Sequence, residues 1–341
     1  MSSKTRNARQ LTELGEFGLI GLVAARAGTA EHVPIGIGDD AAAFRWQNGC
    51  LGLATSDMLL EGVHFDLSYC DPWRLGRKSL AVNLSDMAAM GGRPRNFLLS
   101  LAIPATISVE FVDEFSSGLL DLANDFEVKL LGGDTCSSRS GLIVSITLYG
   151  EQEQSRIVKR TGALPGDAVF VTGTLGDSAL GLELLRKGQR EGYCIERHLD
   201  PKPRVGEGMA LAESRLVSAM IDVSDGLLAD LGHITDSSGV GARLWLDRIP
   251  LSSEFAAHFA NGCSGRHALA FSGGEDYELL FTAPAHRCSE IRELLARFGT
   301  PVAEIGEITA NPGILVVSPE GSIVPVAKAG FDHFTCPPPH I

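Results

Sequence analysis

A glycine-rich bend that carries two adjacent acids, Gly36-Ile37-Gly38-Asp39-Asp40, constrains this sequence most strongly. It follows a short apolar entry, and its glycines permit a tight bend that residues with a β-carbon would disfavour. The spacing also matches the dinucleotide-binding fingerprint, whose loop must approach a pyrophosphate closely. Because Asp39 and Asp40 would face that anion, we reject the dinucleotide interpretation. Neighbouring carboxylates stay ionised at low cost only when water or a cation neutralises them. The motif therefore indicates either a solvated acidic turn or a cation site.

The same combination of glycine or serine with an acid recurs along the chain, each time near an apolar segment that we expect to form a strand. One such acid alone is more typical of a helix cap or a turn than of a metal ligand. Their repetition favours a common site, since gathered carboxylates repel one another and hard cations relieve the repulsion. The acids in this set are Asp39, Asp40, Asp57, Asp134, Asp222, Asp225, Glu275 and Asp276.

A further acid is predicted on a helix from Arg74 to Met90, which shows two stripes at helical spacing. The apolar and polar stripes are Leu80, Leu84 and Met87, and Ser79, Asn83 and Asp86, respectively. Small uncharged groups that end in one acid are unusual for a solvated helix face, which is commonly rich in lysine and glutamate. We therefore expect Asp86 to point into a polar site.

All-oxygen ligation is typical of Mg²⁺, which binds through a few carboxylates and through substrate phosphates. Thr55, Ser56 and Ser224 would add hydroxyl oxygens beside the acids. A metal-rich acidic site suggests phosphoryl transfer to a small molecule. The familiar ATP-binding signatures are absent from the sequence, including the P-loop and the protein-kinase motifs. The residues alone thus indicate metal-dependent phosphate chemistry in an unfamiliar fold.

Composition narrows the possible partners of the chain. The net charge is −13 over 341 residues, and no cluster of Lys and Arg provides the basic footprint that nucleic-acid binding requires. No apolar run reaches the length of a membrane span, and residues 1–10 lack the apolar core of a secretory signal. The 7 cysteines are scattered, with no CxxC pair. They predict reduced thiols in the cytoplasm and argue against a structural zinc site.

The alternation of apolar segments predicts two domains, at 11–155 and 156–334, with flexible tails at 1–10 and 335–341. For the first domain we predict helices at 11–27, 74–90 and 108–126, and strands at 50–55, 96–103, 128–131 and 142–149. For the second we predict helices at 178–186, 204–215, 227–236 and 291–298, and strands at 168–172, 218–223, 242–246, 277–282, 302–308 and 314–317. Residues 189–199 are left as a connection without assigned structure.

Two further features fit either a functional or a purely structural role. The loop from Gly173 to Ser178 precedes a helix, so its N–H groups are suited to bind an anion, although a capped turn fits the sequence equally well. His64 lies in a predicted loop at 61–65. A histidine in such a place is more often packed or solvated than functional.

Taken together and in order, the motifs resemble the thiamine-monophosphate kinases of the aminoimidazole-ribonucleotide synthetase superfamily. The likeness extends from about Glu13 to Phe334, nearly the whole chain. Single motifs such as GGD are weak signals, whereas SGGEDYEL and AVNLSDMAAMG distinguish this family from its relatives. The matching segments are GIGDD at 36–40, TSD at 55–57, GVHF at 62–65, KSLAVNLSDMAAMG at 78–91, LGGDT at 131–135, DVSDG at 222–226 and SGGEDYEL at 272–279.

The resemblance implies a PurM-like N-terminal α/β domain, whose sheet pairs in a homodimer, followed by a PurM-like C-terminal α+β domain. It implies transfer of the ATP γ-phosphoryl group to thiamine phosphate, with several Mg²⁺ ions. The metal ligands would be Asp40, Thr55, Ser56, Asp57, Asp86, Asp134, Asp222 and Asp225, with Asp39 nearby. Gly133, Asp134, Arg160 and Ser224 would contact ATP, and His64, Glu275 and Phe331 would contact thiamine phosphate.

These implied roles agree with the chemistry of the reaction. The acceptor is itself a phosphate with a second pKa near 6, so it is largely dianionic at neutral pH and needs no general base. Glu275 is hypothesised to balance the thiazolium charge, and Phe331 to pack on a ring. The alternatives are another ATP-using enzyme of the superfamily, such as aminoimidazole-ribonucleotide or selenophosphate synthetase, and a non-catalytic nucleotide-binding protein. Against a selenophosphate synthetase, no cysteine precedes the glycine-rich bend, since the first is Cys50.

Overall fold

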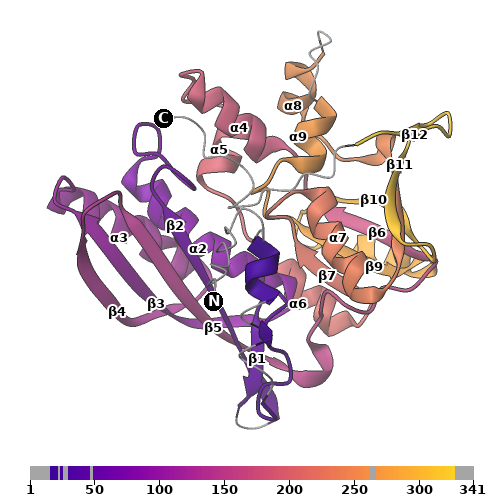
Figure 1. The fold of residues 1–341 in the computed structure, drawn as a ribbon, viewed down its shortest axis with the longest axis horizontal. Coiled ribbons are helices and arrows are strands. Elements are labelled where there is room, and N and C mark those ends of the chain that lie inside the picture. The colour runs from indigo at the N-terminus through magenta and orange to yellow at the C-terminus, as the bar shows by residue number, and fades with distance from the viewer. Residues whose placement is uncertain (1–15, 22–23, 26–29, 47–48, 261–265, 327–341) are drawn as a thin grey trace, which may run out of the picture.

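Two β-sheets, each with its own helices, make up the described part of the chain, and they lie side by side in Figure 1. The computed structural model describes residues 16–21, 24–25, 30–46, 49–260 and 266–326. The first sheet is formed by residues 42–153 and the second by residues 167–324. None of the helices described is long and apolar enough to cross a lipid bilayer.

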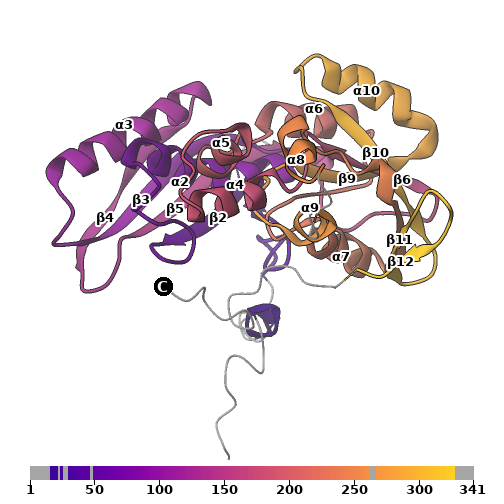
Figure 2. The ribbon, with the colours of Figure 1, turned by 90° about the horizontal axis from the view of Figure 1, so that it is seen from above.

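The first sheet has five strands, of which only β3 and β4 pair in parallel. Its spatial order is β1 (Ala42–Arg45), β2 (Cys50–Leu60), β5 (Ile143–Glu153), β3 (Arg93–Pro104) and β4 (Lys129–Ser138). Two helices, α2 (Pro72–Ala89) and α3 (Val109–Asp125), cover one face of this sheet (Figure 2). The side chains of β5 alternate between buried and partly exposed along the strand, as expected when only one face is covered.

The second sheet has seven strands, and only β8 and β11 pair in parallel. Its spatial order is β12 (Ile323–Val324), β11 (Gly313–Val317), β8 (Gly241–Trp245), β10 (Val302–Thr309), β6 (Asp167–Thr172), β9 (Leu279–Pro284) and β7 (Ala219–Asp222). The helices around it are α4 (Asp177–Arg186), α5 (Tyr193–Leu199), α6 (Val205–Ser214), α7 (Leu227–Ser238), α8 (Ser253–His258), α9 (Arg266–Ser272) and α10 (Cys288–Ala296).

Helix α2 connects the two halves, because it packs against α3, β2 and β5 on one side and against α6 and β7 on the other. It begins at Pro72, and the side chain of Asp71 caps it by accepting a hydrogen bond from the Arg74 N–H. Gly208 on α6 lets the two helices approach closely, since a β-carbon there would lie 2.1 Å from the Ala88 carbonyl oxygen. Both predicted stripes of α2 are buried except at Asp86, which is partly exposed.

Two predicted strands are longer in the structure than the predictions at 50–55 and 128–131. Strand β2 continues through Ser56 and Asp57 to Leu60, because it pairs with β5 along its whole length. Strand β4 likewise continues through 132–135, paired with β3. Gly133 makes this pairing possible, since a β-carbon would overlap the Leu99 carbonyl oxygen at 1.6 Å.

Several other elements differ from the predictions. Helix α5 occupies most of the connection left without structure, and α8, α9, β1 and β12 were not predicted. Residues 16–21 and 24–25 of the predicted N-terminal helix are helical. The remainder of that helix and the predicted flexible tails lie outside the described residues.

Candidate active site

Three carboxylates from distant parts of the chain meet between the two sheets. Asp40 follows the glycine-rich bend, Asp86 comes from α2, and Asp222 ends β7. One carboxylate oxygen of each lies within 4.8 Å of the others. The bend has the expected geometry, with Gly38 at a φ of 125°, a value that favours glycine. The grouping predicted for these acids is therefore present in the fold.

Asp57 extends this cluster from the neighbouring strand β2. Its N–H donates to the Asn83 side-chain oxygen at 3.2 Å, while its Oδ2 atom is buried and has no hydrogen-bond partner. A buried carboxylate oxygen without a donor is costly. This oxygen, together with three neighbouring acids, fits a hard divalent cation such as Mg²⁺. Asp40, Asp57, Asp86 and Asp222 are accordingly the residues suited to hold one.

Two hydroxyl groups orient the acids of the cluster. Thr55 Oγ1 donates a hydrogen bond to Asp86 Oδ2, and Ser85 Oγ donates to Asp222 Oδ2 at 2.6 Å. Ser85 was not among the predicted site residues. Its position beside Asp86, on a helix with few charged residues, was the sequence signal that could have identified it. The Ser85 contact also ties α2 of the first half to β7 of the second.

Arg160 binds Asp40 with two hydrogen bonds. Its Nη2 lies 2.9 Å from Asp40 Oδ1, and its Nε lies 3.2 Å from Oδ2. The backbone N–H of Arg160 also donates to Asp39 Oδ1 at 3.2 Å. The sequence showed no basic neighbour beside these acids, and the fold supplies one from 120 residues away. The predicted ATP contact of Arg160 would thus come from a guanidinium that is already fixed by a carboxylate.

Burial and mutual repulsion raise the pKa values of the acids. Burial, followed by the charge of Asp40, raises the pKa of Asp39 to about 6. Burial raises the pKa of Asp57 to about 6, although an interaction with the Asp86 side chain lowers it in part. Burial and the charge of Asp40 raise the pKa of Asp222 to about 8. The pKa of Asp86 is raised well above its usual range by burial and by the acids around it.

These pKa values predict how the stability of the metal-free protein depends on pH. The unfolded aspartates titrate near 3.8, so the folded form binds more protons between that value and the folded pKa values of about 6 to 8. The stability that these protonated acids contribute is therefore fully present below about pH 4 and is lost as pH rises to 8. In EDTA, we expect the melting temperature to fall by at least about 5 °C between pH 5 and pH 8. Asp222→Asn should reduce this fall, and a wild-type melting temperature that rose over the interval would contradict the assignment.

The predicted ligands Ser56 and Asp134 lie on the other face of the first sheet. Side chains alternate along β2, so Ser56 points away from Thr55 and Asp57, and its hydroxyl lies 3.0 Å from Thr147 Oγ1. The pairing of Asp134 with Ser100, and of Ser100 with Ser145, places Asp134 on the same open face. Three strand spacings, about 14 Å, separate it from β2. Within one chain, Asp134 and the neighbouring Gly133 do not join the cluster.

The predicted ligand Asp225 belongs to a second group of acids. Ligand atoms of Asp225, Asp230 and His233 lie within 4.8 Å of one another. Asp230 is 1 % exposed, and its Oδ2 accepts the N–H groups of Ser224, Asp225 and Gly226 at 3.0 to 3.2 Å. This carboxylate fixes the turn that carries Ser224 and Asp225, and it occupies the donors at the start of α7.

His64 and Glu275, the predicted substrate contacts, line one cavity of about 250 Å³. Its other lining residues are Gly62, Val63, Phe65, Asp66, Tyr69, Leu182, Arg186 and His198. His64 Nδ1 accepts the Leu60 N–H at 3.0 Å, so a neutral His64 carries its proton on Nε2. Glu275 lies 3.1 Å from Lys78 and 3.3 Å from His198. Phe331 lies outside the described residues.

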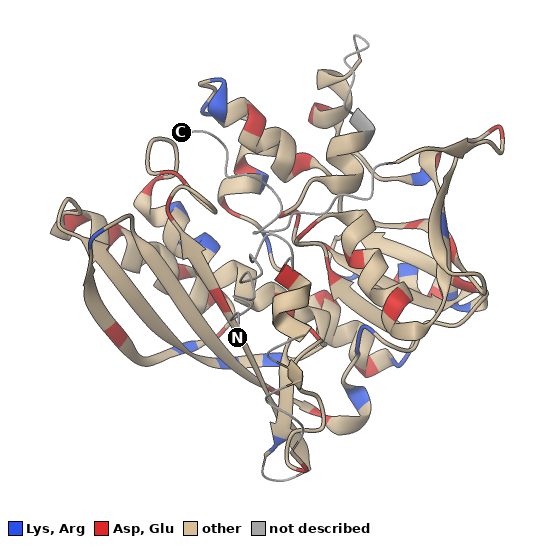
Figure 3. Ribbon diagram, viewed as in Figure 1, with Lys and Arg blue, Asp and Glu red and all other residues tan. Residues whose placement is uncertain are grey.

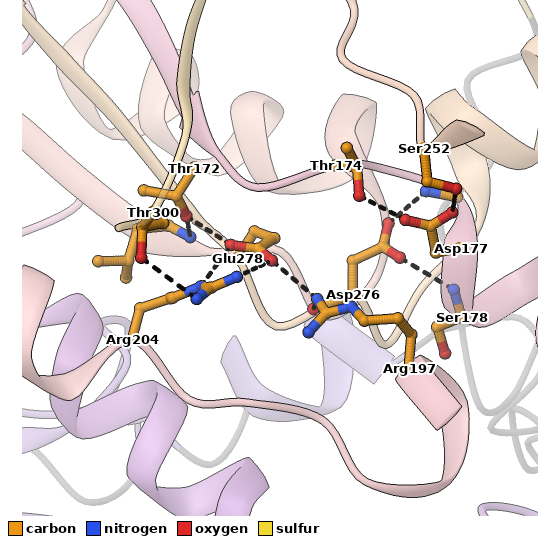
Figure 4. Close-up of polar contacts among 12 residues, drawn as sticks. Thr172, Thr174, Asp177, Ser178, Arg197, Arg204, Ser252, Asp276, Glu278 and Thr300 are labelled. Atoms are coloured by element: carbon orange, nitrogen blue, oxygen red, sulfur yellow. Dashed lines mark hydrogen bonds and ion pairs between the residues drawn. The ribbon is translucent and has the colours of Figure 1, made fainter. Parts of the chain in front are cut away.

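The remaining acids of the SGGEDYEL segment are structural (Figure 4). Asp276 accepts hydrogen bonds from the N–H groups of Gly176 and Ser178 at 2.6 and 3.2 Å. The loop at 173–178 is therefore a turn capped by the Asp276 side chain, which occupies N–H groups that the alternative anion site would need. Asp276 thus does not join the acid cluster, contrary to prediction. Glu278 binds Arg197 and Arg204 at 2.8 and 2.6 Å.

Carboxylates of the chain thus occupy N–H donors at the starts of both α4 and α7. Phosphates that approach the cluster would therefore have to be neutralised by side chains or by cations. Lys and Arg are spread over both halves of the molecule in Figure 3. Among the described residues, Arg160 is a basic side chain that contacts the cluster, through its ion pair with Asp40.

Comparison with known proteins agrees with this architecture. Residues 38–152 match the AIR synthase related protein N-terminal domain, and residues 165–318 match the corresponding C-terminal domain. The fold and these matches define the chain as an AIR synthase related protein of two domains, which confirms the predicted fold class.

Within that class, the similarity to one group is extensive. Over 330 residues, the chain is 39 % identical to the thiamine-monophosphate kinase of Escherichia coli, with 95 % of this chain and 99 % of the relative covered. The Bacillus subtilis thiamine-monophosphate kinase is 34 % identical, with 94 % and 100 % covered. A solved structure, AaThiL complexed with AMPPCP and TMP, superposes with a TM-score of 0.83 at 36 % identity and covers 96 % of this chain and 99 % of that one. The chain belongs to the thiamine-monophosphate kinase family.

Proposed function

We propose that this protein transfers the γ-phosphoryl group of ATP to thiamine phosphate, which gives thiamine diphosphate and ADP and completes the synthesis of thiamine diphosphate. The observation that carries the proposal is the convergence of Asp40, Asp86 and Asp222 from both domains. The family relationship and the relative complexed with AMPPCP and TMP support the choice of substrates.

The proposed roles of the residues follow from their positions. Asp40, Asp57, Asp86 and Asp222 would hold Mg²⁺, with Thr55 orienting Asp86. Bound Mg²⁺ would supply positive charge between two anionic reactants. Asp225 and Ser224, on the turn fixed by Asp230, would complete the nucleotide side, with Arg160 beside Asp40. The cavity at His64 and Glu275 would hold the acceptor. The acceptor phosphate needs no general base, because its second pKa near 6 leaves it largely dianionic.

A coupled assay tests this function directly. Protein, ATP, Mg²⁺ and thiamine phosphate should yield thiamine diphosphate and ADP in equal amounts, and EDTA should stop the reaction. Thiamine without its phosphate is the control acceptor, since its uncharged hydroxyl would need a general base. Failure to form thiamine diphosphate with any divalent cation, in protein that is folded, would refute the proposal.

We further propose that the protein works as a homodimer formed through the first sheet. Strand β4 is an edge strand of 10 residues, of which nine are exposed and the last is partly exposed. Leu131 is 62 % exposed, and Met58 on the open face is 54 % exposed. Long exposed edges and uncovered apolar side chains are usually protected in natural proteins. A second copy would cover both, and its Asp134 would reach the cluster that Asp134 of the same chain does not.

Subunit complementation tests this arrangement. Asp134→Asn and Asp86→Asn should each be inactive as pure dimers. After the two variants are unfolded together and refolded, mixed dimers should regain part of the activity, because one site then holds both wild-type acids. No recovery in mixtures that sedimentation shows to be dimeric would argue against a shared site.

We place the reaction in the cytoplasm, where ATP is abundant and thiols remain reduced. The cysteines among the described residues are all free thiols. Burial raises the pKa of Cys70 to about 11, and burial together with the charge of Asp177 raises the pKa of Cys194 further above its usual range. Both thiols are therefore protonated and unreactive at neutral pH.

A further inference from the structure

Lys78 is a buried lysine at the junction of the two domains. Its side chain is 1 % exposed, although it carries the ammonium group that proteins bury least readily. The Nζ atom lies 3.1 Å from Glu275 Oε1 and 3.3 Å from Oε2, and it donates to the His64 carbonyl oxygen at 3.5 Å. One side chain of the first domain thus contacts both residues that are proposed to bind the acceptor.

The position of the Glu275 side chain depends on these contacts. Glu275 has a φ of 65°, a conformation that a residue with a side chain adopts only when its surroundings impose it. Its N–H donates to the Ser224 carbonyl oxygen at 2.7 Å, so its backbone is attached to the turn beside the acid cluster. Its carboxylate faces Lys78 and His198 instead. Although burial raises the pKa of Glu275, the charge of Lys78 and the contact with His198 bring it below the usual value.

His198 is the second residue that contacts the Glu275 carboxylate. Its Nδ1 lies 3.3 Å from Glu275 Oε2 and 3.0 Å from Ser178 Oγ. Burial and the charge of Lys78 lower the pKa of His198 to about 3, so this imidazole is neutral at physiological pH. The positive charge that faces Glu275 is therefore that of Lys78. Hence Glu275 is already compensated before any ligand arrives, and it presents a fixed hydrogen-bond acceptor to the cavity.

Helix α2 also sets the distance between this cavity and the acid cluster. Lys78 and Asp86 are eight residues apart, which places them on neighbouring lines of the helix surface and about 12 Å apart along its axis. Helix α2 therefore carries both Lys78, which contacts two residues that line the cavity, and Asp86, which belongs to the acid cluster. An acceptor held at the Glu275 end would have its phosphate at a fixed distance from the acids.

We propose that Lys78 is a positioning residue for the acceptor, which orients Glu275 and the His64 loop in the cavity and fixes both relative to the acid cluster. The inference rests on the proposed function, because it concerns how the acceptor of that reaction is held. Lys78 acts through Glu275 and the His64 carbonyl group and takes no part in the transfer itself. Its loss should therefore weaken acceptor binding and leave nucleotide binding unchanged.

The test compares Lys78→Met, Lys78→Arg, Glu275→Gln and the double variant Lys78→Met/Glu275→Gln with the wild-type enzyme. Lys78→Met should raise the KM for thiamine phosphate about tenfold or more, as expected for the loss of hydrogen bonds to a charged group, with the KM for ATP within about twofold of the wild-type value. Lys78→Arg should restore part of the loss. Lys187→Met, at an exposed lysine of the same domain as Glu275, is the control and should change neither value.

The double variant separates positioning from general structural damage. Because Lys78 acts mainly through Glu275, with the longer 3.5 Å contact to the His64 carbonyl oxygen as a second route, the KM of the double variant should lie close to that of Glu275→Gln and well below the product of the two single effects. The double variant buries no unpaired charge, so it serves the test even if Lys78→Met fails to fold. Equal increases in both KM values, or fully additive effects, would overturn the role of Lys78. Absence of wild-type turnover would instead overturn the proposed function.

Discussion

Asp86→Asn is expected to lower kcat by at least about 100-fold while leaving the protein as stable as the wild type or more stable. Asp86 shares the cluster with Asp40 and Asp222, and asparagine removes the negative charge that would hold a divalent cation. The same substitution relieves repulsion in the metal-free protein, because burial and neighbouring acids raise the pKa of Asp86 well above its usual range. Loss of activity should therefore accompany an unchanged or higher melting temperature.

The two readouts together distinguish a functional acid from a structural one. Steady-state rates of thiamine diphosphate formation and thermal unfolding in EDTA would be measured on the same preparations. Asp113→Asn, at an exposed acid of α3, is the matched control and should change neither. Near-normal turnover of Asp86→Asn would remove the basis for the cluster, and a large drop in its melting temperature would assign Asp86 a structural role.

Glu278→Ala is expected to destabilise the fold by about 3 to 5 kcal/mol. The Glu278 side chain is 1 % exposed and forms ion pairs with Arg197 and Arg204, and it accepts a hydrogen bond from Thr172 at 2.7 Å. Alanine would leave the guanidinium of Arg197 in the interior without a carboxylate and that of Arg204 with only its longer contact to Glu207, at 3.6 Å. The cost therefore arises from uncompensated buried charge, more than from the loss of favourable contacts.

Chemical denaturation of Glu278→Ala and Glu278→Gln would measure this effect. Glutamine keeps hydrogen-bonding oxygen at the site, so its variant should lose less stability than alanine. Glu183→Ala, which removes an exposed ion pair with Lys187, is the control and should cost less than about 1 kcal/mol. A loss of similar size in Glu183→Ala and Glu278→Ala would show that the buried network contributes little.

The acid cluster was predictable because its members share a local pattern. Asp40 and Asp222 each stand beside a short apolar segment with glycine or serine, and Asp86 ends a polar stripe on an otherwise apolar helix. Backbone geometry then brings such positions together. The pattern did not separate cluster acids from others, since Asp276 has the same neighbours but caps α4. Which acid reaches the cluster depends on how the second sheet packs against α2.

The strand boundaries explain why Ser56 and Asp134 were grouped with Thr55 and Asp57. Their segments contain aspartate and glycine, which strands disfavour, so both strands were predicted to end early. Pairing with β5 and β3 overrides this local preference. Once β2 is seen to continue, the alternation of side chains places Ser56 and Asp57 on opposite faces.

The basic partners of the acids could not be predicted at all. Arg160 reaches Asp40 and Lys78 reaches Glu275 from 120 and 197 positions away along the chain. A contact over such a separation has no local signature. Lys78 also stands in a helical segment where lysine is usually exposed. Its burial follows from the packing of α2 between the two domains.

Anomalous diffraction from Mn²⁺ tests the central claim most directly. Crystals grown with Mn²⁺, a non-hydrolysable ATP analogue and thiamine phosphate would locate the ions without reference to activity. We expect anomalous peaks between the nucleotide phosphates and the carboxylates of Asp40, Asp86 and Asp222, with Asp57 Oδ2 among the ligands. Peaks only on the nucleotide or elsewhere on the protein, with these four acids unliganded, would contradict the account.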